Sequence, residues 1–513
     1  MTVKEAFRIE RDTMGEVKVP RRALFGGQTQ RAVENFPVSG IREHPVFIQA
    51  FILVKKAAAL ANYELGTLDR RRACAISDAC DEILGEKLHS FRKLARKPGS
   101  GDSDAMRGSL LAREDDIRDG TALPAKPYID PGYRDQFPVD VFQAGAGTSF
   151  NMNCNEVIAN LANLGLGGKL GKYDPIHPND HVNMAQSTND TFPTATRIAT
   201  LTLLRELLPA LDGLAFALDA KGEEFSDVIK SGRTHLQDAV PVTLGQEFKA
   251  YAAAVRRGSR LLSDAADELR QLGIGGTATG TGINTPQGFR YTIVGYLGQL
   301  TRLSLEPAED LREAMQSQLA LAAVSAALRN LALEITRITN DLRLLSSGPL
   351  TGLAEIILPP VQPGSSIMPG KVNPSMLECM NQICFHVIGA DAAVAYGVQA
   401  GQLELNVMMP MMAYETIFSI EILKNYLPVF VDRCIAGIQA DRERCRAYYI
   451  TSPALATALN PIIGYARAAE IAKESAASGK PIPELLREKK LLSEDQIAEI
   501  FTPEFLAGQA DRD

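Results

Sequence analysis

The stretch Leu321–Leu345, LAAVSAALRNLALEITRITNDLRLL, decides the fold of this chain. Its apolar residues recur at alternating spacings of three and four, which places them on one stripe of an α-helix. They are Leu321, Val324, Leu328, Leu331, Ile335, Ile338, Leu342 and Leu345. The pattern predicts one helix over Leu311–Leu345, about 50 Å long at 1.5 Å per residue, which Ser346–Pro349 ends. Because such a helix cannot bury its own stripe, we expect it to lie in a helical bundle.

Other segments indicate companions for this helix. Alanine-rich helical patterns cover Thr194–Leu218 and Gln246–Leu272, and another follows Met376. Strand signals are limited to short runs at Val17–Pro20 and around Pro138–Phe142. The sequence therefore predicts a mainly α protein with a few small hairpins.

Composition indicates a globular chain of several domains. The 513 residues are 45% hydrophobic and 22% charged, with a net charge of −7. This charge argues against nucleic acid or an anionic membrane as a partner. The seven cysteines and six histidines show no zinc-binding spacing. The N-terminus is polar, and no uninterrupted apolar run reaches about 18 residues, so we expect a cytoplasmic enzyme without a membrane span.

The most informative loop is Gly364–Pro374, GSSIMPGKVNP. It differs from a phosphate-binding P-loop, because five residues separate Gly364 from Gly370 and Val372 stands where Ser or Thr is required. Two hydroxyls, one ammonium group, one amide and free backbone N–H groups are suited to binding a carboxylate substrate.

Three further polar loops point to the same kind of ligand. His177–Asp180 and Gln186–Asp190 lead into a helix expected to begin near Pro193, and a helix N-terminus favours anions. Gly232–Asp238 contains His235, for which the polar neighbours favour a functional role. The glycines of Gly145–Asn151 allow the backbone to approach a ligand closely.

Together these four loops resemble the aspartase/fumarase superfamily, for which GSSIMPGKVNP is close to diagnostic. The resemblance covers nearly the whole chain except most of Leu88–Asp135, a charged, Gly- and Ser-rich segment that we expect to be an exposed insertion. It implies a homotetramer whose long helices form a common core and whose active sites combine loops from three subunits. It also implies three domains: an N-terminal domain 1–186 with the inserted loop about 88–135, a central long-helix domain 187–443 and a small C-terminal domain 444–513.

Within the superfamily, Ser187-Thr188-Asn189-Asp190 and Phe137–Asn153 resemble aspartate ammonia-lyase. This implies a carbon–nitrogen lyase that reversibly eliminates ammonia, in anti geometry, from L-aspartate to give fumarate. Thr234-His235 and Gly275–Thr285 instead resemble class II fumarate hydratase, which converts L-malate to fumarate and water. A third alternative is a non-catalytic structural relative such as a lens crystallin.

The resemblance also implies roles for individual residues. The catalytic set is Ser365 as the base, in alkoxide form, with His235 paired to Glu378. The α-carboxylate would be held by Lys371 and Asn373. The β-carboxylate, as it becomes an aci-carboxylate, would be surrounded by Thr148, Ser187, Thr188 and Ser366. Contacts to the amino group or the neighbouring carboxylate are expected from Asn189, Thr234 and His235. An accessory anion site is expected at His177, Asn179 and Asp180.

No step of this reaction needs redox chemistry or an electron sink, so no cofactor is expected. Divalent metal activates some aspartases, but the sequence contains no ligand cluster for a catalytic metal. The expected partners are a small dicarboxylate or amino-acid substrate and further copies of the chain, with neither nucleic acid nor membrane.

Overall fold

A computed structural model describes residues 7–85, 91–96 and 128–507 of the chain. Most of the expected insertion Leu88–Asp135 lies outside the described residues. At its edges the structure has a short helix α5, Phe91–Leu94, and a 3₁₀ helix η1, Pro131–Gln136.

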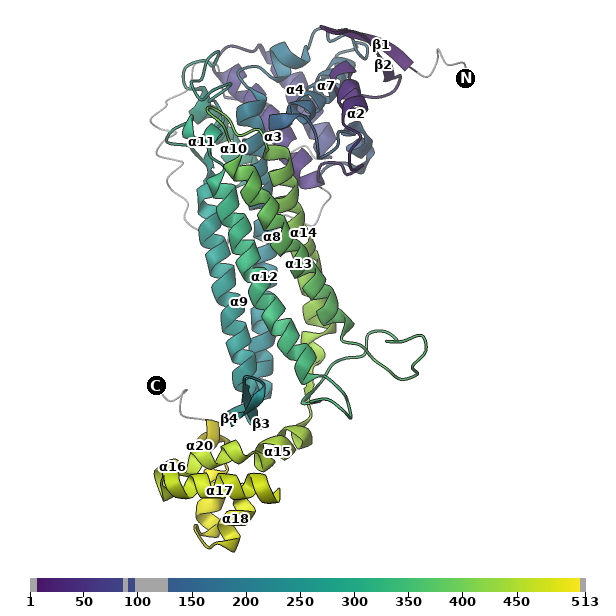
Figure 1. Cartoon of the computed structure of the whole chain (residues 1–513). Coiled ribbons are helices and arrows are strands. Elements are labelled where there is room, and N and C mark those ends of the chain that lie inside the picture. The colour runs from purple at the N-terminus through teal and green to yellow at the C-terminus, as the bar shows by residue number, and fades with distance from the viewer. Residues whose placement is uncertain (1–6, 86–90, 97–127, 508–513) are drawn as a thin grey trace. The chain divides into compact units, whose positions relative to one another are not determined.

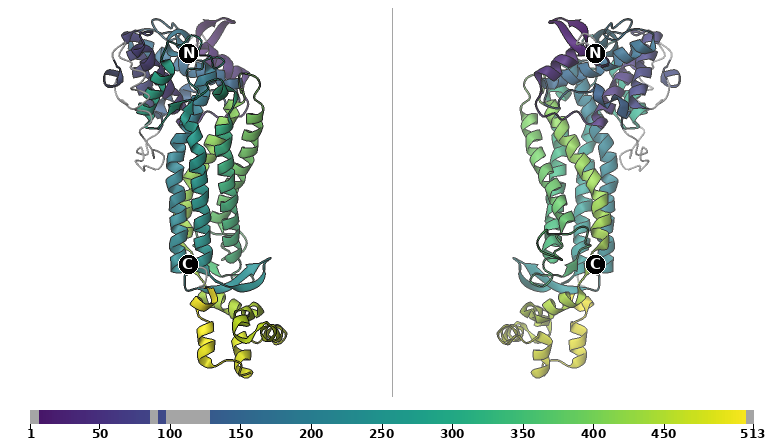
Figure 2. Two further views of the ribbon diagram at one scale, coloured as in Figure 1. Left: turned by 90° about the vertical axis from the view of Figure 1, so that its left-hand side faces the viewer. Right: turned by 90° about the vertical axis from the view of Figure 1, so that its right-hand side faces the viewer.

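The backbone contacts divide the chain into two compact units. Unit 1 comprises 1–209, 261–329 and 386–424, and unit 2 comprises 210–260, 330–385 and 425–513. Five long helices contribute residues to both units: α8 Thr188–Glu224, α9 Leu244–Ala266, α12 Leu319–Leu345, α13 Ser375–Gln399 and α14 Met409–Arg433. Within each unit, segments of these helices run side by side (Figure 1, Figure 2). The predicted mainly α fold and the three companion helices are confirmed, whereas the three-domain division stays a prediction.

The apolar stripe of α12 is buried as predicted, since none of its eight residues is more than 6% exposed. The helix is shorter than predicted and begins at Leu319. A separate short helix, α11 Glu313–Gln316, precedes it. Two hydrogen bonds account for the break: the Met315 carbonyl accepts one from the distant Asn406 N, and the Ser317 hydroxyl accepts one from Leu319 N. Both bonds compete with continuous helical pairing.

Unit 1 is built around α3, Pro45–Glu64, which packs on α4 Arg70–Leu84, α7 Thr148–Gly165 and α10 Phe289–Thr301. Helix α2, Gly27–Asn35, packs on α7 and on the hairpin β1 Phe7–Asp12 and β2 Gly15–Pro20. An aromatic cluster fills the centre: Phe47, Phe51, Phe150 and Phe192, with neighbouring ring centroids as close as 4.9 Å.

One of the two predicted strand regions is confirmed. Val17–Pro20 lies in β2. The prediction of a strand around Pro138–Phe142 is wrong. Only an isolated bridge between Arg42 and Asp140 forms there. The Asp140 carboxylate accepts hydrogen bonds from the backbone N–H groups of Ser39 and Gly40, so this segment is held by a side chain instead of a strand ladder.

Unit 2 contains a hairpin that the sequence analysis missed, β3 Ile229–Thr234 and β4 Gln237–Thr243. Helix α15, Arg442–Thr451, packs on β3, and Ile229 of β3 joins the hydrophobic cluster of the C-terminal helices. These helices are α16 Asn460–Ile463, α17 Tyr465–Ser478, α18 Ile482–Glu488, α19 Glu494–Ile500 and α20 Pro503–Ala507.

The remaining strands form two-residue pairs: β5 Gln271–Leu272 with β6 Glu306–Pro307, and β7 Ile356–Ile357 with β8 Gln439–Ala440.

Two helices, α3 and α12, are long and apolar enough to cross a membrane by length and composition alone. The sequence analysis expected none. The most apolar window of α3 is 89% buried inside the protein, which is the pattern of a core helix, whereas that of α12 is 44% buried.

Candidate functional site

The predicted site residues fall into two groups, one in each unit. Unit 1 contains Thr148, His177, Asn179, Asp180, Ser187, Thr188 and Asn189. Unit 2 contains Thr234, His235, Ser365, Ser366, Lys371, Asn373 and Glu378.

Thr148 is exposed at the first turn of α7, and the backbone before it has an unusual shape. Ala146 and Gly147 both have positive φ, 60° and 83°. A Cβ at position 147 would lie 2.1 Å from the ring of Phe192, so only glycine fits. Ala146 N also donates to the carbonyl of Val407 at 2.8 Å. The glycine-rich loop therefore positions Thr148.

The Ser187–Asp190 segment begins α8 at Thr188, earlier than the predicted start near Pro193. The cause is Asp190, a fully buried carboxylate that accepts hydrogen bonds from Ser187 N at 3.0 Å, Gly275 N at 3.0 Å and Thr277 N at 2.8 Å. Burial raises the pKa of Asp190 to about 6. Asp190 thus caps the helix and ties its start to the Gly273–Gly282 loop.

Asn189 also ties the start of α8 to the Gly273–Gly282 loop, since its side-chain amide donates to the carbonyl of Ala278 at 2.8 Å.

The His177–Asp180 loop is a separate feature. It opens a π-helical turn, η3 Pro178–Val182, in which His177 Nδ1 accepts from Asp180 N and lies 3.4 Å from the Asp180 carboxylate. Asn179 is exposed there.

Sequence reasoning missed Lys55, a fully buried lysine of α3 beneath the start of α8. Its Nζ donates to the side-chain oxygens of Asn151, Asn183 and Gln186 at 2.6, 2.9 and 3.0 Å. Burial lowers the pKa of Lys55 to about 7. The available signal was the pair of consecutive lysines inside an otherwise apolar helix.

In unit 2, the GSSIMPGKVNP loop folds back on Ser365. The Ser365 Oγ accepts hydrogen bonds from Ile367 N at 3.2 Å and Met368 N at 3.0 Å. Two backbone donors on one oxygen favour negative charge at that oxygen. Gly364 N donates to the carbonyl of Lys371 at 2.9 Å, and the Asn373 amide donates to the carbonyl of Gly364 at 2.7 Å, which closes the loop.

The charged and polar groups of this loop are available to a ligand. Ser366 and Lys371 are exposed and Ser365 is half-buried. Within the described part of the chain, Lys371 forms no ion pair. An exposed ammonium without a carboxylate partner is suited to bind an anionic substrate group.

His235 lies at the tip of the β3–β4 hairpin, where His235 and Leu236 form a two-residue turn with φ of 56° and 58°. This turn type favours Asn-Gly, so His and Leu adopt a strained backbone here. Thr234, which precedes them, is exposed. The expected pair of His235 with Glu378 does not form among the residues described in one chain. Glu378 instead lies 3.9 Å from Arg343.

A buried charge cluster at the base of this hairpin was also missed by sequence reasoning. Lys230 donates to Glu247 at 2.8 Å and lies 3.3 Å from Glu355, while both terminal nitrogens of Arg233 lie 2.9 Å from Glu355 oxygens. Lys230 is 1% and Glu355 0% exposed. Glu355 directly precedes β7, so the cluster joins the His235 hairpin to the chain that leads to Ser365.

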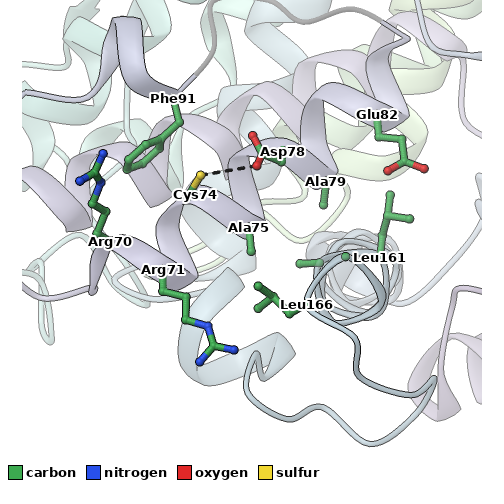
Figure 3. A pocket seen from close by; sticks show the side chains of 12 residues that line it. Arg70, Arg71, Cys74, Ala75, Asp78, Ala79, Glu82, Phe91, Leu161 and Leu166 are labelled. Carbon is green, nitrogen blue, oxygen red and sulfur yellow. Dashed lines mark hydrogen bonds between the residues drawn. The ribbon is translucent and has the colours of Figure 1, made fainter.

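A cavity of about 630 Å³ lies elsewhere in unit 1, between α4 and α7. Figure 3 shows Arg70, Arg71, Asp78 and Glu82 around it, with the apolar side chains of Phe91 and Leu161. None of the predicted site residues lines this cavity. Residues 7–85, 91–96 and 128–507 contain no group of three or more His, Cys, Asp or Glu arranged to hold a metal ion.

Comparisons with known proteins identify the family to which such loops belong. The lyase family profile matches residues 128–389, and the profile of the fumarase C C-terminus matches 455–508. Aspartate ammonia-lyase of Corynebacterium glutamicum is 43% identical over 507 residues, covering 98% of this chain and 88% of that protein.

Solved structures share the fold as well. The cobalt-bound "fumarate lyase:delta crystallin" of Brucella melitensis has a TM-score of 0.83 and 44% identity, covering 96% of this chain and 98% of that one. A class II fumarase of Schistosoma mansoni has a TM-score of 0.83 and 32% identity, covering 98% and 99%. With its loops, its long helices and these matches over nearly the full length, the chain belongs to the aspartase/fumarase superfamily of lyases.

Proposed function

We infer that the protein is an aspartate ammonia-lyase, a carbon–nitrogen lyase that converts L-aspartate to fumarate and ammonia reversibly. The single observation that carries the proposal is the Ser365 hydroxyl, whose oxygen accepts two backbone N–H groups on an open loop. The relatives named aspartate ammonia-lyase, 41% to 44% identical over nearly the whole chain, support ammonia as the leaving group.

The reaction needs a strong base, because the proton next to the β-carboxylate is barely acidic and its loss creates a dianionic aci-carboxylate. A serine alkoxide is such a base. The N–H groups of Ile367 and Met368 stabilise the alkoxide relative to the neutral hydroxyl, and the positive charge of Lys371 on the same loop would act in the same direction. Ser365 would take the Cβ proton, after which the carbon–nitrogen bond breaks and ammonium departs.

The two carboxylates would be bound by different kinds of donor. Lys371 and Asn373 would hold the α-carboxylate. In the loop as described, the Asn373 amide donates to Gly364, so this contact requires an exchange of hydrogen bonds. Neutral donors would surround the β-carboxylate, and they strengthen as charge develops. These donors are Thr148, Ser187, Thr188 and Ser366.

The remaining predicted residues complete the site. Asn189, Thr234 and His235 would contact the amino group or the neighbouring carboxylate, and Glu378 would orient His235. Because His235 and Glu378 do not pair within the described residues of one chain, this contact requires another subunit. His177, Asn179 and Asp180 would form the accessory anion site. No cofactor is proposed, divalent metal would act at most as a non-catalytic activator, and the location would be cytoplasmic.

We also propose that the chain assembles into a homotetramer through its long helices, with active sites shared between subunits. Large apolar side chains are exposed on these helices, which is typical of an interface. They are Phe216, Leu261, Leu319, Leu333, Leu344, Phe385 and Tyr396. Light scattering is expected to give a mass four times that of the 55.5 kDa chain. A monomeric mass would contradict the proposal.

The function is tested by fumarate absorbance with L-aspartate or L-malate supplied separately. We expect fumarate and an equal amount of ammonia from L-aspartate, and no fumarate from L-malate. Fumarate from L-malate alone would identify a fumarate hydratase. The absence of fumarate with both substrates would favour a non-catalytic relative.

A further inference from the structure

The polar centre beneath the start of α8 is organised around the Lys55 ammonium. An ammonium group has three N–H donors and no acceptor. The three amide oxygens of Asn151, Asn183 and Gln186, at 2.6 to 3.0 Å, therefore satisfy it completely. Among the described residues, no carboxylate forms an ion pair with Lys55. The positive charge is thus held by neutral dipoles.

Each of the three amides is oriented by a second hydrogen bond. Asn183 Nδ2 donates to the main-chain carbonyl of Gln186 at 3.2 Å, and Gln186 Nε2 donates to carbonyls of its own turn. Asn151 Nδ2 donates to Thr188 Oγ1 at 2.9 Å. All three amide oxygens consequently face Lys55. The Asn151 amide in addition connects Lys55 to Thr188, because its oxygen accepts from Lys55 and its nitrogen donates to Thr188.

Thr188 occupies the first position of α8, and its hydroxyl oxygen is the acceptor of the Asn151 bond. A hydroxyl that accepts on one side has its own hydrogen free to donate on another. No residue in the described ranges accepts that hydrogen. Thr188 is 7% exposed, so the donor is held at the edge of the protein interior.

We propose that Lys55 is a positioning residue of the elimination, and that the chain Lys55–Asn151–Thr188 holds the Thr188 hydroxyl as a donor to the substrate β-carboxylate. The inference rests on the proposed function. Hydrogen bonds arranged in one direction polarise one another, so the buried cation strengthens the last donor in the chain. The effect grows as the carboxylate becomes the doubly charged aci-form, which lowers the barrier more than it tightens ground-state binding.

The neighbouring lysine provides a matched control. Lys56 is on the same helix and is equally buried, but it pairs with Asp81 of α4. Neither residue belongs to the chain that reaches Thr188. The double variant Lys56→Met with Asp81→Asn removes both charges of that pair, so it perturbs the same core without touching the proposed chain.

The test compares kcat, KM and the inhibition constant of succinate, a dicarboxylate that has no amino group to lose. Lys55→Met is expected to lower kcat about tenfold, while KM and the succinate constant stay within about twofold. Asn151→Leu interrupts the chain but leaves two acceptors on Lys55, and the same result is expected. The Lys56→Met/Asp81→Asn control is expected to retain the kcat of the unmodified enzyme.

A double-mutant cycle separates positioning from structural support. In a Thr188→Val background, Lys55→Met and Asn151→Leu are expected to cause no further loss of kcat, because the chain no longer ends in a donor. Additive losses, or changes in KM alone, would overturn the inference. If Lys55→Met fails to fold, the cycle of Asn151→Leu with Thr188→Val tests the inference by itself. An unmodified enzyme that is inactive on both L-aspartate and L-malate would refute the proposed function, which is a distinguishable result.

Discussion

Replacing Ser365 with alanine is expected to lower kcat for L-aspartate by at least about 10³-fold, because no other group is proposed to remove the Cβ proton. The Ser365 oxygen is the acceptor of two backbone N–H groups on a loop whose following residues, 366–372, are exposed. Alanine deletes that oxygen and leaves the loop closure between Gly364 and Asn373 intact. Fumarate absorbance at saturating aspartate measures the loss.

Binding should survive this substitution, since Ser365 is not assigned to either carboxylate. The inhibition constant of succinate is expected to remain within about threefold of the unmodified value. Ser478→Ala serves as the control, because that exposed hydroxyl bonds only to the backbone at the end of its own helix: it donates to Glu474 O and accepts from Lys480 N. If Ser365→Ala turned over aspartate at a normal rate, another residue would have to be the base.

The second large effect is expected on stability, from Glu355→Gln. Glu355 is 0% exposed and contacts both Lys230 and Arg233, so its neutralisation removes the carboxylate that these two cations share and leaves the ion pair of Lys230 with Glu247. Breaking a buried ion pair by removing one partner costs about 3–5 kcal/mol. Because the entropy of unfolding grows with chain length, we expect the Tm of this 513-residue chain to fall by about 3–5 °C in a calorimetric scan.

An exposed ion pair of the same unit provides the comparison. Asp219→Asn removes the partner of Arg256, which lies 2.9 Å away on the surface. Exposed pairs contribute about 0–1 kcal/mol, so its Tm should change by no more than about 2 °C. Equal shifts for Glu355→Gln and Asp219→Asn would show that the buried cluster does not stabilise unit 2.

The hairpin of β3 and β4 illustrates what the sequence pattern concealed. Its strands contain Lys230, Arg233 and Asp238, so no regular alternation of apolar and polar residues appears. The turn His235-Leu236 also lacks the Asn-Gly signal of a two-residue hairpin. Lys230 and Arg233 are accommodated only because Glu247 and Glu355 neutralise them in the folded protein.

Helix ends were predicted less well than helix interiors for a related reason. The stripe of α12 was located correctly, but its first residue depends on the bond between Asn406 N and the Met315 carbonyl. The start of α8 depends on Asp190, whose carboxylate binds backbone N–H groups of Gly275 and Thr277. Partners this distant in the chain leave no local signal.

The sequence by itself determined the helical stripe and the GSSIMPGKVNP loop, because periodicity and turn chemistry depend on neighbouring residues. Only the tertiary structure decided which partners the buried charges meet. Lys55 meets its three acceptors across 96, 128 and 131 residues, and Arg233 meets Glu355 across 122. A lysine or glutamate is tolerated in the interior only where folding brings such partners to it, since burying an unpaired charge costs several kcal/mol.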